Sequence, residues 1–271
     1  MKREVLIAGT AFFVALFLFS GSMCYRQYAD SRQSAETFES VADLVLEEPA
    51  PTLPPACAEE TTDPGEIEPQ ITASQKYAEV YEQNTDFVGW ISIDGTNINY
   101  PVMQDIDNPN FYLKHGFDKQ YSKYGVPYVQ ENCCLGISDN VIIYGHHMKD
   151  GSMFADLCKY ESEDFYREHK TICFDTLSGF GKYEIVAVFK TVVDSEAGFQ
   201  YYRFVNAEDE VDFCAFLSEC KVLGLYDTGV SASYGDKLIT LSTCEYSRAG
   251  GRMIVVAKES VSSFSKVNGS F

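Results

Sequence analysis

Apolar and polar positions are arranged differently in three successive parts of the chain, and each part predicts a different structure. Residues 5–25 carry no charged side chain and are mostly apolar. At about 1.5 Å per residue, a helix of this length spans the ~30 Å core of a bilayer, so the run predicts one transmembrane helix. Two basic residues stand on each side of it, and the α-amine adds a further positive charge at the start. This small bias places residues 1–4 in the cytoplasm.

The same apolar run has a second interpretation as a signal peptide that is removed from the mature protein. Ser20, Gly21 and Ser22 provide the small residues that a cleavage site needs near the end of such a run. Under either interpretation, the remainder of the chain is exported and any folded domain lies outside the membrane.

The second part, residues 26–73, is acidic and rich in proline. Between residues 34 and 74 there are ten acidic residues, no basic ones and six of the nine prolines. Such a segment buries too little apolar surface to fold, and its charges repel one another. We therefore expect an extended extracellular linker that holds the folded domain off the membrane, with a transiently helical stretch at residues 38–46.

In the third part, residues 74–260, short apolar runs alternate with turn residues, and residues 261–271 follow as a tail. A helix with Ser74 as its N-cap is predicted at the start of this part, and further helices are predicted at 151–160 and from 206 or 208 to 220. The predicted strands lie at residues 89–93, 97–102, 125–130, 140–144, 171–175, 182–193, 236–244 and 252–257. Many short strands bounded by turn signals favour a closed β-barrel or a β-sandwich.

The last two predicted strands carry the most informative side chains. The loop between them contains two adjacent glycines and is typical of a hairpin, which places Cys244 at the exit of one strand beside Arg252 at the entry of the next. A nearby cation favours the thiolate, which is the reactive form of cysteine. His146 and His147 follow a third strand, the one at residues 140–144. Cysteine, histidine and arginine at strand ends indicate a thiol acyl-transfer site.

Three blocks of the sequence, in this order, resemble the class B sortases. The blocks are DFVGWISIDG running into INYPVMQ at residues 86–104, YGHHMKDGSMF at 144–154, and TLSTC with the following GR at 240–252. The resemblance covers roughly residues 74–260. It implies a mainly β fold: a closed eight-stranded barrel with an N-terminal helix and a helix between strands six and seven, preceded by the transmembrane helix.

The resemblance also implies an activity, that of a membrane-anchored cysteine transpeptidase of the cysteine endopeptidase class. Such an enzyme would cut a C-terminal sorting motif of a secreted protein between threonine and glycine. It would hold the acyl group on Cys244 as a thioester and transfer it to an amine of a peptidoglycan precursor. The implied location is the cell membrane of a Gram-positive bacterium, single-pass, with a cytoplasmic N-terminus and an extracellular catalytic domain.

Roles for individual residues follow from the same resemblance. His146, directly after a Tyr-Gly pair, would give a proton to the leaving amine, and Arg252 would donate hydrogen bonds to the oxyanion. Consecutive residues of an extended segment point to opposite sides, so His147 should face away from Cys244, and its replacement by alanine should cost little. We treat Glu245 as solvated. The predicted substrate-binding residues are Ser242, Tyr144, Thr243, Tyr201 and Tyr202.

Tyr201 and Tyr202 lie in a segment, residues 193–235, that immediately precedes the Cys244 strand. Their aromatic rings could grip an extended peptide at the mouth of the same groove. The alternative is that both rings pack the helix of this segment onto the barrel. The sequence favours neither.

Charge and cysteine content narrow the choice of function. The chain has 40 acidic and 21 basic residues, a net charge of −19, which argues against nucleic-acid binding. The nine cysteines form no CxxC pair and no zinc-ligand spacing, and no cofactor is indicated. Their number is odd, and we take Cys244 as the free thiol. We expect Cys214 and Cys220 to be packing residues of a helix, and Cys133 and Cys134 to be separate thiols.

Two other functions remain open at this point. One is a pilin-polymerising sortase, in which the acceptor amine is a lysine of a pilin. The other belongs to a different class, a catalytically silent, membrane-tethered peptide-binding domain that uses the same groove. The combination of Cys244, His146 and Arg252 favours an enzyme, because a binding module does not need all three.

Overall fold

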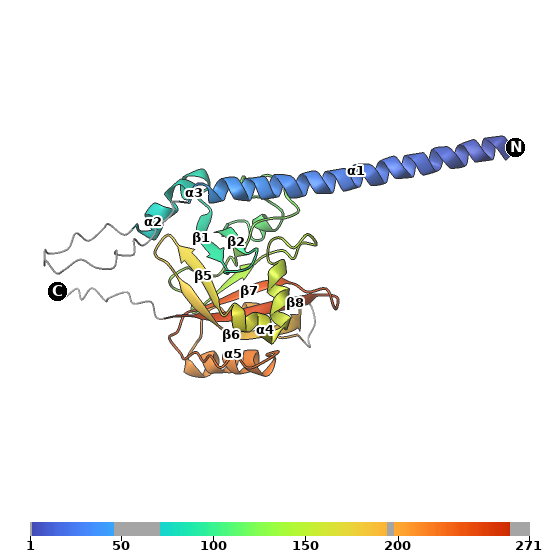
Figure 1. The fold of residues 1–271 in the computed structure, drawn as a ribbon. Helices are drawn as coiled ribbons and strands as arrows, with labels where there is room; N and C mark the ends of the chain where they lie inside the picture. The colour runs from blue at the N-terminus through green and yellow to red at the C-terminus, as the bar shows by residue number, and fades with distance from the viewer. Residues whose placement is uncertain (1, 46–70, 194–197, 261–271) are drawn as a thin grey trace, which may run out of the picture.

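A computed structural model of the chain describes residues 2–45, 71–193 and 198–260. The tail at 261–271 and most of the predicted linker lie outside the described residues. Eight strands close into one barrel in the order β1-β2-β3-β4-β7-β8-β6-β5, as predicted for this mainly β fold (Figure 1). The strands are β1 (Phe87–Ser92), β2 (Asn99–Met103), β3 (Tyr128–Val129), β4 (Asn140–Tyr144), β5 (Thr171–Thr176), β6 (Lys182–Val192), β7 (Leu238–Cys244) and β8 (Gly251–Glu259).

Two of the strand pairs are parallel, and one of these positions the site. β4 and β7 run side by side in the same direction from the pair Asn140–Leu238 to the pair Tyr144–Ser242. The exits of the two strands therefore meet at one edge of the barrel. β7 and β8 form the predicted antiparallel hairpin, and its last register pair is Cys244–Arg252.

The main core is filled by aliphatic and aromatic side chains from all eight strands, and the short β3 contributes Val129. β4, β7 and the middle parts of β6 and β8 are buried at consecutive positions, so both of their faces are covered. Ile142, Val188, Leu241 and Val255 are fully buried at the centre of this core.

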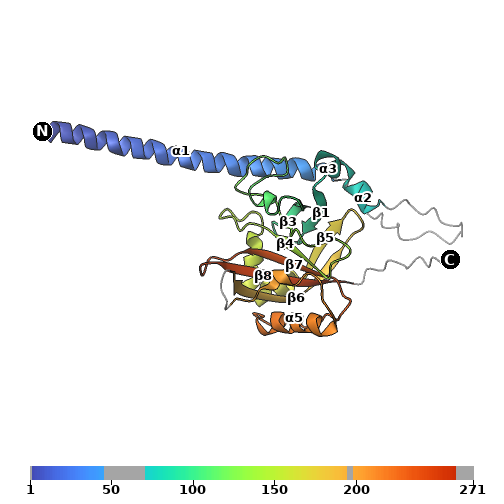
Figure 2. The same ribbon diagram turned by 180° about the vertical axis from the view of Figure 1, so that it is seen from behind.

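The helices agree in part with the predicted ones. Thr72, rather than Ser74, caps α2 (Ala73–Lys76), the first helix of residues 71–260, through a capping box with Gln75. Asp209 caps α5 (Glu210–Val222), which packs against β6 on the side of the barrel opposite α1 (Lys2–Ala42), as Figures 1 and 2 show. The helix α4 was not predicted. The helices after α1 are α2 (Ala73–Lys76), α3 (Ala78–Gln83), η1 (Phe111–Leu113), η2 (Ala155–Glu161), α4 (Glu163–Glu168), η3 (Tyr201–Arg203) and α5 (Glu210–Val222).

The structure differs from the predicted linker at its N-terminal end. α1 (Lys2–Ala42) continues without a break through the first part of the segment that was expected to be extended. Its last turns lie against the barrel, where Val41 is buried and the Phe38 ring packs edge-on against Tyr100 at 5.1 Å. These two residues are three positions apart and share one helical face, and the prolines begin only at Pro49. Contact with the barrel thus orders residues whose composition alone favours disorder.

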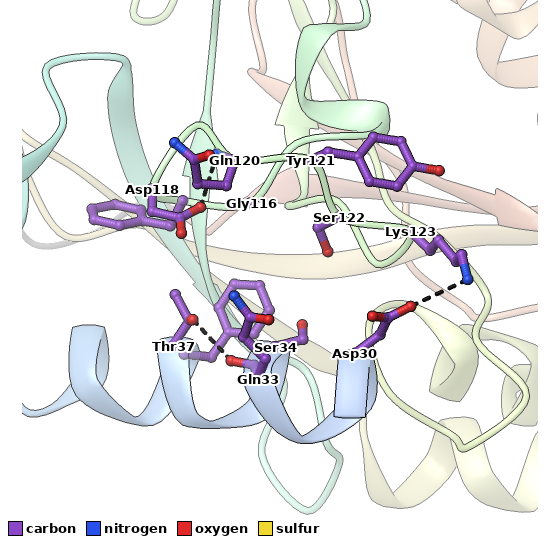
Figure 3. Close-up of a pocket in the computed structure, with 12 residues that line it drawn as sticks. Asp30, Gln33, Ser34, Thr37, Gly116, Asp118, Gln120, Tyr121, Ser122 and Lys123 are labelled. Atoms are coloured by element: carbon purple, nitrogen blue, oxygen red, sulfur yellow. Dashed lines mark hydrogen bonds and ion pairs between the residues drawn. The ribbon is translucent and has the colours of Figure 1, made fainter. Parts of the chain in front are cut away.

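Polar contacts extend this interface along α1. Figure 3 shows Asp30, Gln33 and Thr37 facing the loop at residues 116–123. The cavity that these residues line has a volume of about 70 Å³. At one end of the cavity Asp30 pairs with Lys123 at 3.2 Å.

The other half of α1 extends beyond the barrel (Figure 1). Large apolar side chains between Phe12 and Met23 are exposed there. Among the described residues, no helix combines the length and the apolarity that crossing a membrane requires. The transmembrane helix at residues 5–25 stays a prediction.

Candidate active site

One groove of about 800 Å³ lies at the exits of β4 and β7 and the entry of β8. It is built where the parallel pair and the hairpin meet. All eight residues that the sequence predicts as catalytic or substrate-binding line it: Cys244, His146, Arg252, Tyr144, Ser242, Thr243, Tyr201 and Tyr202.

Cys244 and Arg252 face each other across the hairpin as its last register pair. The Arg252 guanidinium donates one hydrogen bond, from Nη1 to the Gly251 carbonyl at 3.0 Å, which leaves most of its five N–H groups for other partners. A Cβ atom on Gly251 would lie 2.4 Å from the Glu245 carbonyl oxygen, so only glycine allows the hairpin to close this tightly. The arrangement sets a half-buried thiol beside a planar cation.

Of the two adjacent histidines, only the first lines the groove. His146 lines the groove, and its Nε2 lies 2.7 Å from the Leu113 carbonyl oxygen. His147 is not among the groove residues. Its Nδ1 lies 3.0 Å from the carbonyl oxygen of Cys244.

Several of the predicted substrate-binding residues form the floor of the groove. Ser242, Thr243 and Tyr201 are almost completely buried, and the hydroxyls of Ser242 and Tyr201 are hydrogen-bonded at 2.7 Å. Burial raises the pKa of Tyr201, so its phenol stays neutral. For Tyr201, the structure favours packing over direct contact with a peptide. Tyr202 is half-buried, and its ring meets Tyr201 edge-on at 5.6 Å.

A chain of side chains joins Tyr144 to the far wall of the groove. Tyr144 donates its hydroxyl hydrogen to Gln130 Oε1, and burial raises the pKa of this phenol. Gln130 in turn donates from Nε2 to the Tyr202 carbonyl at 3.0 Å and to Asn132 Oδ1 at 2.5 Å. The tyrosine side chain is thereby held in place from the loop that follows β3.

The structure adds polar groove residues that the sequence analysis missed. They are Asn110, Gln130, Glu131 and Asn132 from loops, and Arg203 from η3. The signal for three of them was the polar run at 130–132, at the end of the strand predicted for residues 125–130. Strand β3 pairs with β4 through Tyr128 and Tyr144, and this pairing brings the run to the groove. The α5 helix of the 193–235 segment does not line it; residues Val193 and 201–203 do.

Glu245 is not solvated, in contrast to the expectation from the sequence. It is 9% exposed. One carboxylate oxygen accepts from the Ser247 backbone N–H at 2.9 Å and the other from the Ser247 hydroxyl at 2.6 Å. Lys190 lies 3.6 Å away. Burial acts to raise the pKa of this carboxyl, but the hydrogen bonds from Ser247 and the charge of Lys190 outweigh it and hold the pKa below its usual range.

The described cysteines are all free, so Cys133 and Cys134 are separate thiols as predicted. Cys214 and Cys220, both on α5, form no bridge either. Cys220 is buried and packs as predicted, whereas Cys214 is exposed, so the prediction that it packs is wrong. Within residues 2–45, 71–193 and 198–260, no group of three or more histidine, cysteine or acidic side chains is placed to hold a metal ion.

Comparisons with known proteins agree with this geometry. Residues 91–260 match the family described as Sortase domain. The chain is 34% identical over 250 residues to Sortase B of Listeria monocytogenes serovar 1/2a, covering 90% of this chain and 92% of that protein. It is 33% identical over 195 residues to Sortase B of Staphylococcus aureus, covering 71% and 75%. The solved Staphylococcus aureus sortase B–substrate complex superposes with a TM-score of 0.63 at 34% identity, covering 69% of this chain and 86% of that one.

Proposed function

Because the chain belongs to the sortase family and is a class B sortase, we propose that Cys244, His146 and Arg252 carry its transpeptidation reaction. The observation that supports this most is their convergence on one groove through two independent pairings. The hairpin register sets Cys244 opposite Arg252, and the parallel pairing of β4 with β7 brings His146 from a distant part of the chain.

In the proposed reaction, the Cys244 thiolate attacks the carbonyl carbon of the scissile peptide bond. The carbon–nitrogen bond breaks, the leaving amine takes a proton from the His146 imidazolium, and a thioester remains on Cys244. An acceptor amine then attacks the thioester carbonyl and forms a new amide bond. The thiolate leaves, and the proton of the amine returns to His146. Arg252 donates hydrogen bonds to the oxyanion of both tetrahedral intermediates.

The finer features of the substrate are also part of the proposal. The donor is a secreted protein with a C-terminal sorting signal, cut between threonine and glycine, and the acceptor is an amine of a peptidoglycan precursor. An open groove lined by Asn110, Asn132 and Arg203 beside the floor tyrosines suits an extended peptide with polar side chains. A pilin lysine as acceptor is the second candidate and predicts the same acyl-enzyme.

The test measures cleavage of a peptide library with a central Thr-Gly bond, with and without triglycine as acceptor, by mass spectrometry. Wild type should form an acyl-enzyme on Cys244 and the triglycine product, and Cys244→Ala should form neither. Arg252→Lys keeps the charge but loses the planar fork, and we expect kcat to fall by about 10²-fold.

Cleavage by Cys244→Ala would refute the mechanism. Peptide binding without any acyl-enzyme in the wild type would favour the catalytically silent binding domain. Near-normal turnover of Arg252→Lys would remove Arg252 from the mechanism and leave it a structural residue at a strand entry.

A further inference from the structure

The parallel ladder between β4 and β7 stops just before the nucleophile. Its last bond runs from the Gly145 N–H to the Ser242 carbonyl at 3.1 Å. Backbone carbonyls alternate in direction along a strand, so the carbonyl of Cys244, two residues further, points to the same side as that of Ser242. β4 ends at Tyr144. The strand that would supply the next N–H has already turned away.

The side chain of His147 takes the place of that missing backbone donor. Its Nδ1 lies 3.0 Å from the Cys244 carbonyl oxygen. A carbonyl oxygen only accepts hydrogen bonds, so Nδ1 carries the hydrogen. The bond links the loop after β4 to the end of β7 at the residue that bears the thiol.

The imidazole ring of His147 is itself held by its neighbours. The Cys158 thiol lies 3.3 Å from Nδ1, and the Tyr246 ring lies against the imidazole with centroids 5.0 Å apart. The Tyr246 hydroxyl donates to the His147 carbonyl at 2.9 Å. Burial, and then the nearby charge of Glu245, raise the pKa of Cys158 to about 11, so this side chain remains a neutral thiol at neutral pH.

A second contact ties the same two strand ends together. The Thr243 hydroxyl donates to the Gly145 carbonyl at 2.8 Å. Gly145 packs flat against the Phe154 ring, where a Cβ atom would lie 2.5 Å from the ring. The backbone on either side of His146 is therefore fixed by Gly145 before it and by the His147 side chain after it.

We propose that His147 is a positioning residue of the reaction: its Nδ1–H holds the Cys244 carbonyl and sets the separation between Cys244 and His146. The role rests on the proposed function of these two residues. It replaces the expectation that substitution of His147 costs little, because that expectation considered only the side of the strand facing the groove. A displacement of reacting groups by about 1 Å can lower a rate by about 10²-fold.

The test compares two substitutions that differ in reach. Asn places an amide N–H close to the position of Nδ1, whereas Gln carries the same group one methylene further out. His147→Ala and His147→Gln should lower kcat for peptide cleavage by about 10- to 100-fold, and His147→Asn should recover most of it. KM should stay within about twofold in all three, because His147 does not line the groove.

His169→Ala is the matched control. The His169 Nδ1 also bonds a backbone carbonyl, that of Asp94 at 2.8 Å, but it lies outside the groove. Its loss should leave kcat unchanged even if it lowers the melting temperature. Melting curves identify which variants are folded. If His147→Ala does not fold, the kcat values of the folded His147→Asn and His147→Gln variants test the proposal.

Three results would overturn the proposal: a kcat for His147→Ala or His147→Gln within twofold of wild type, an Asn variant no better than the Gln variant, or a loss that lies in KM. Cys244→Ala is assayed in parallel. If it cleaves the peptide, the proposed function fails; if it is inert while the His147 variants match wild type, only the positioning role fails.

Discussion

At the scale of single residues, Glu245, the residue after Cys244, stabilises the hairpin that carries the candidate site. Glu245 binds Ser247 through both carboxylate oxygens, and its backbone N–H donates to the Gly251 carbonyl at 3.0 Å. Lys190 stands between Glu245 and Glu161 and pairs with both. The carboxylate thereby fixes the loop that joins Cys244 to Arg252.

This network predicts a pH dependence of stability. The folded-state pKa of Glu245 lies below its unfolded value, so its contribution is fully present above the unfolded pKa of about 4.3 and is lost as the pH falls through the folded pKa. Glu245→Gln should lower the free energy of unfolding by about 1–2 kcal/mol at pH 7. The difference from wild type should shrink below pH 4.

Chemical denaturation at pH 7 and pH 3.5 measures this difference. Glu161→Gln is the control, since Glu161 also pairs with Lys190 but is half exposed, and its effect should be smaller at both pH values. An equal deficit of Glu245→Gln at both pH values would show that the carboxylate charge is not what stabilises the loop.

At the scale of elements, α1 has two parts: its C-terminal turns pack on the barrel, and its N-terminal half extends away from it. Its last turns belong to a second, smaller hydrophobic core, a cluster of buried residues that includes Val41, Tyr77, Phe87 and Trp90. The apolar half between Phe12 and Met23 is exposed. One helix thus joins the barrel rigidly to the segment proposed as the anchor.

The same substitution should lower the stability of the protein by different amounts in the two halves of α1. Val41→Ala removes two buried methyl groups and should lower the free energy of unfolding by about 1–3 kcal/mol. Val14→Ala makes the same change at an exposed position of the same helix and should stay within about 0.5 kcal/mol of wild type. Chemical denaturation of the full chain in detergent measures both. Equal effects would mean that the end of α1 does not pack on the barrel in solution.

At the scale of the whole molecule, we propose that residues 5–25 hold the protein in the cell membrane with the barrel outside. The exposed apolar side chains of α1 support this. The protein extracted from the membrane fraction should have an intact mass that includes these residues, and protease added outside intact cells should digest the acidic segment at 46–70. A mature chain that starts shortly after Ser22, found in the medium, would instead establish a cleaved signal peptide.

By itself, the sequence determined what depends on neighbours along the chain. The period of apolar residues and the turn glycines were sufficient for most strands, and a hairpin brings Cys244 beside Arg252 because its two arms are adjacent in sequence. The three motif blocks added the family and the closure of the barrel. The alternation of an extended segment allowed only one of His146 and His147 to face the groove, and the resemblance to the family, which places the catalytic residue directly after a Tyr-Gly pair, selected His146.

The tertiary structure alone decided what depends on contacts between distant segments. The parallel pairing of β4 with β7 joins residues about a hundred positions apart and has no local signal, yet it places His146 near Cys244 and leaves a carbonyl for His147 to bind. The burial of Glu245 and the helical order of residues 26–42 were missed for the same reason. A charged side chain or an acidic segment is predicted as solvated until a surface from elsewhere in the chain covers it.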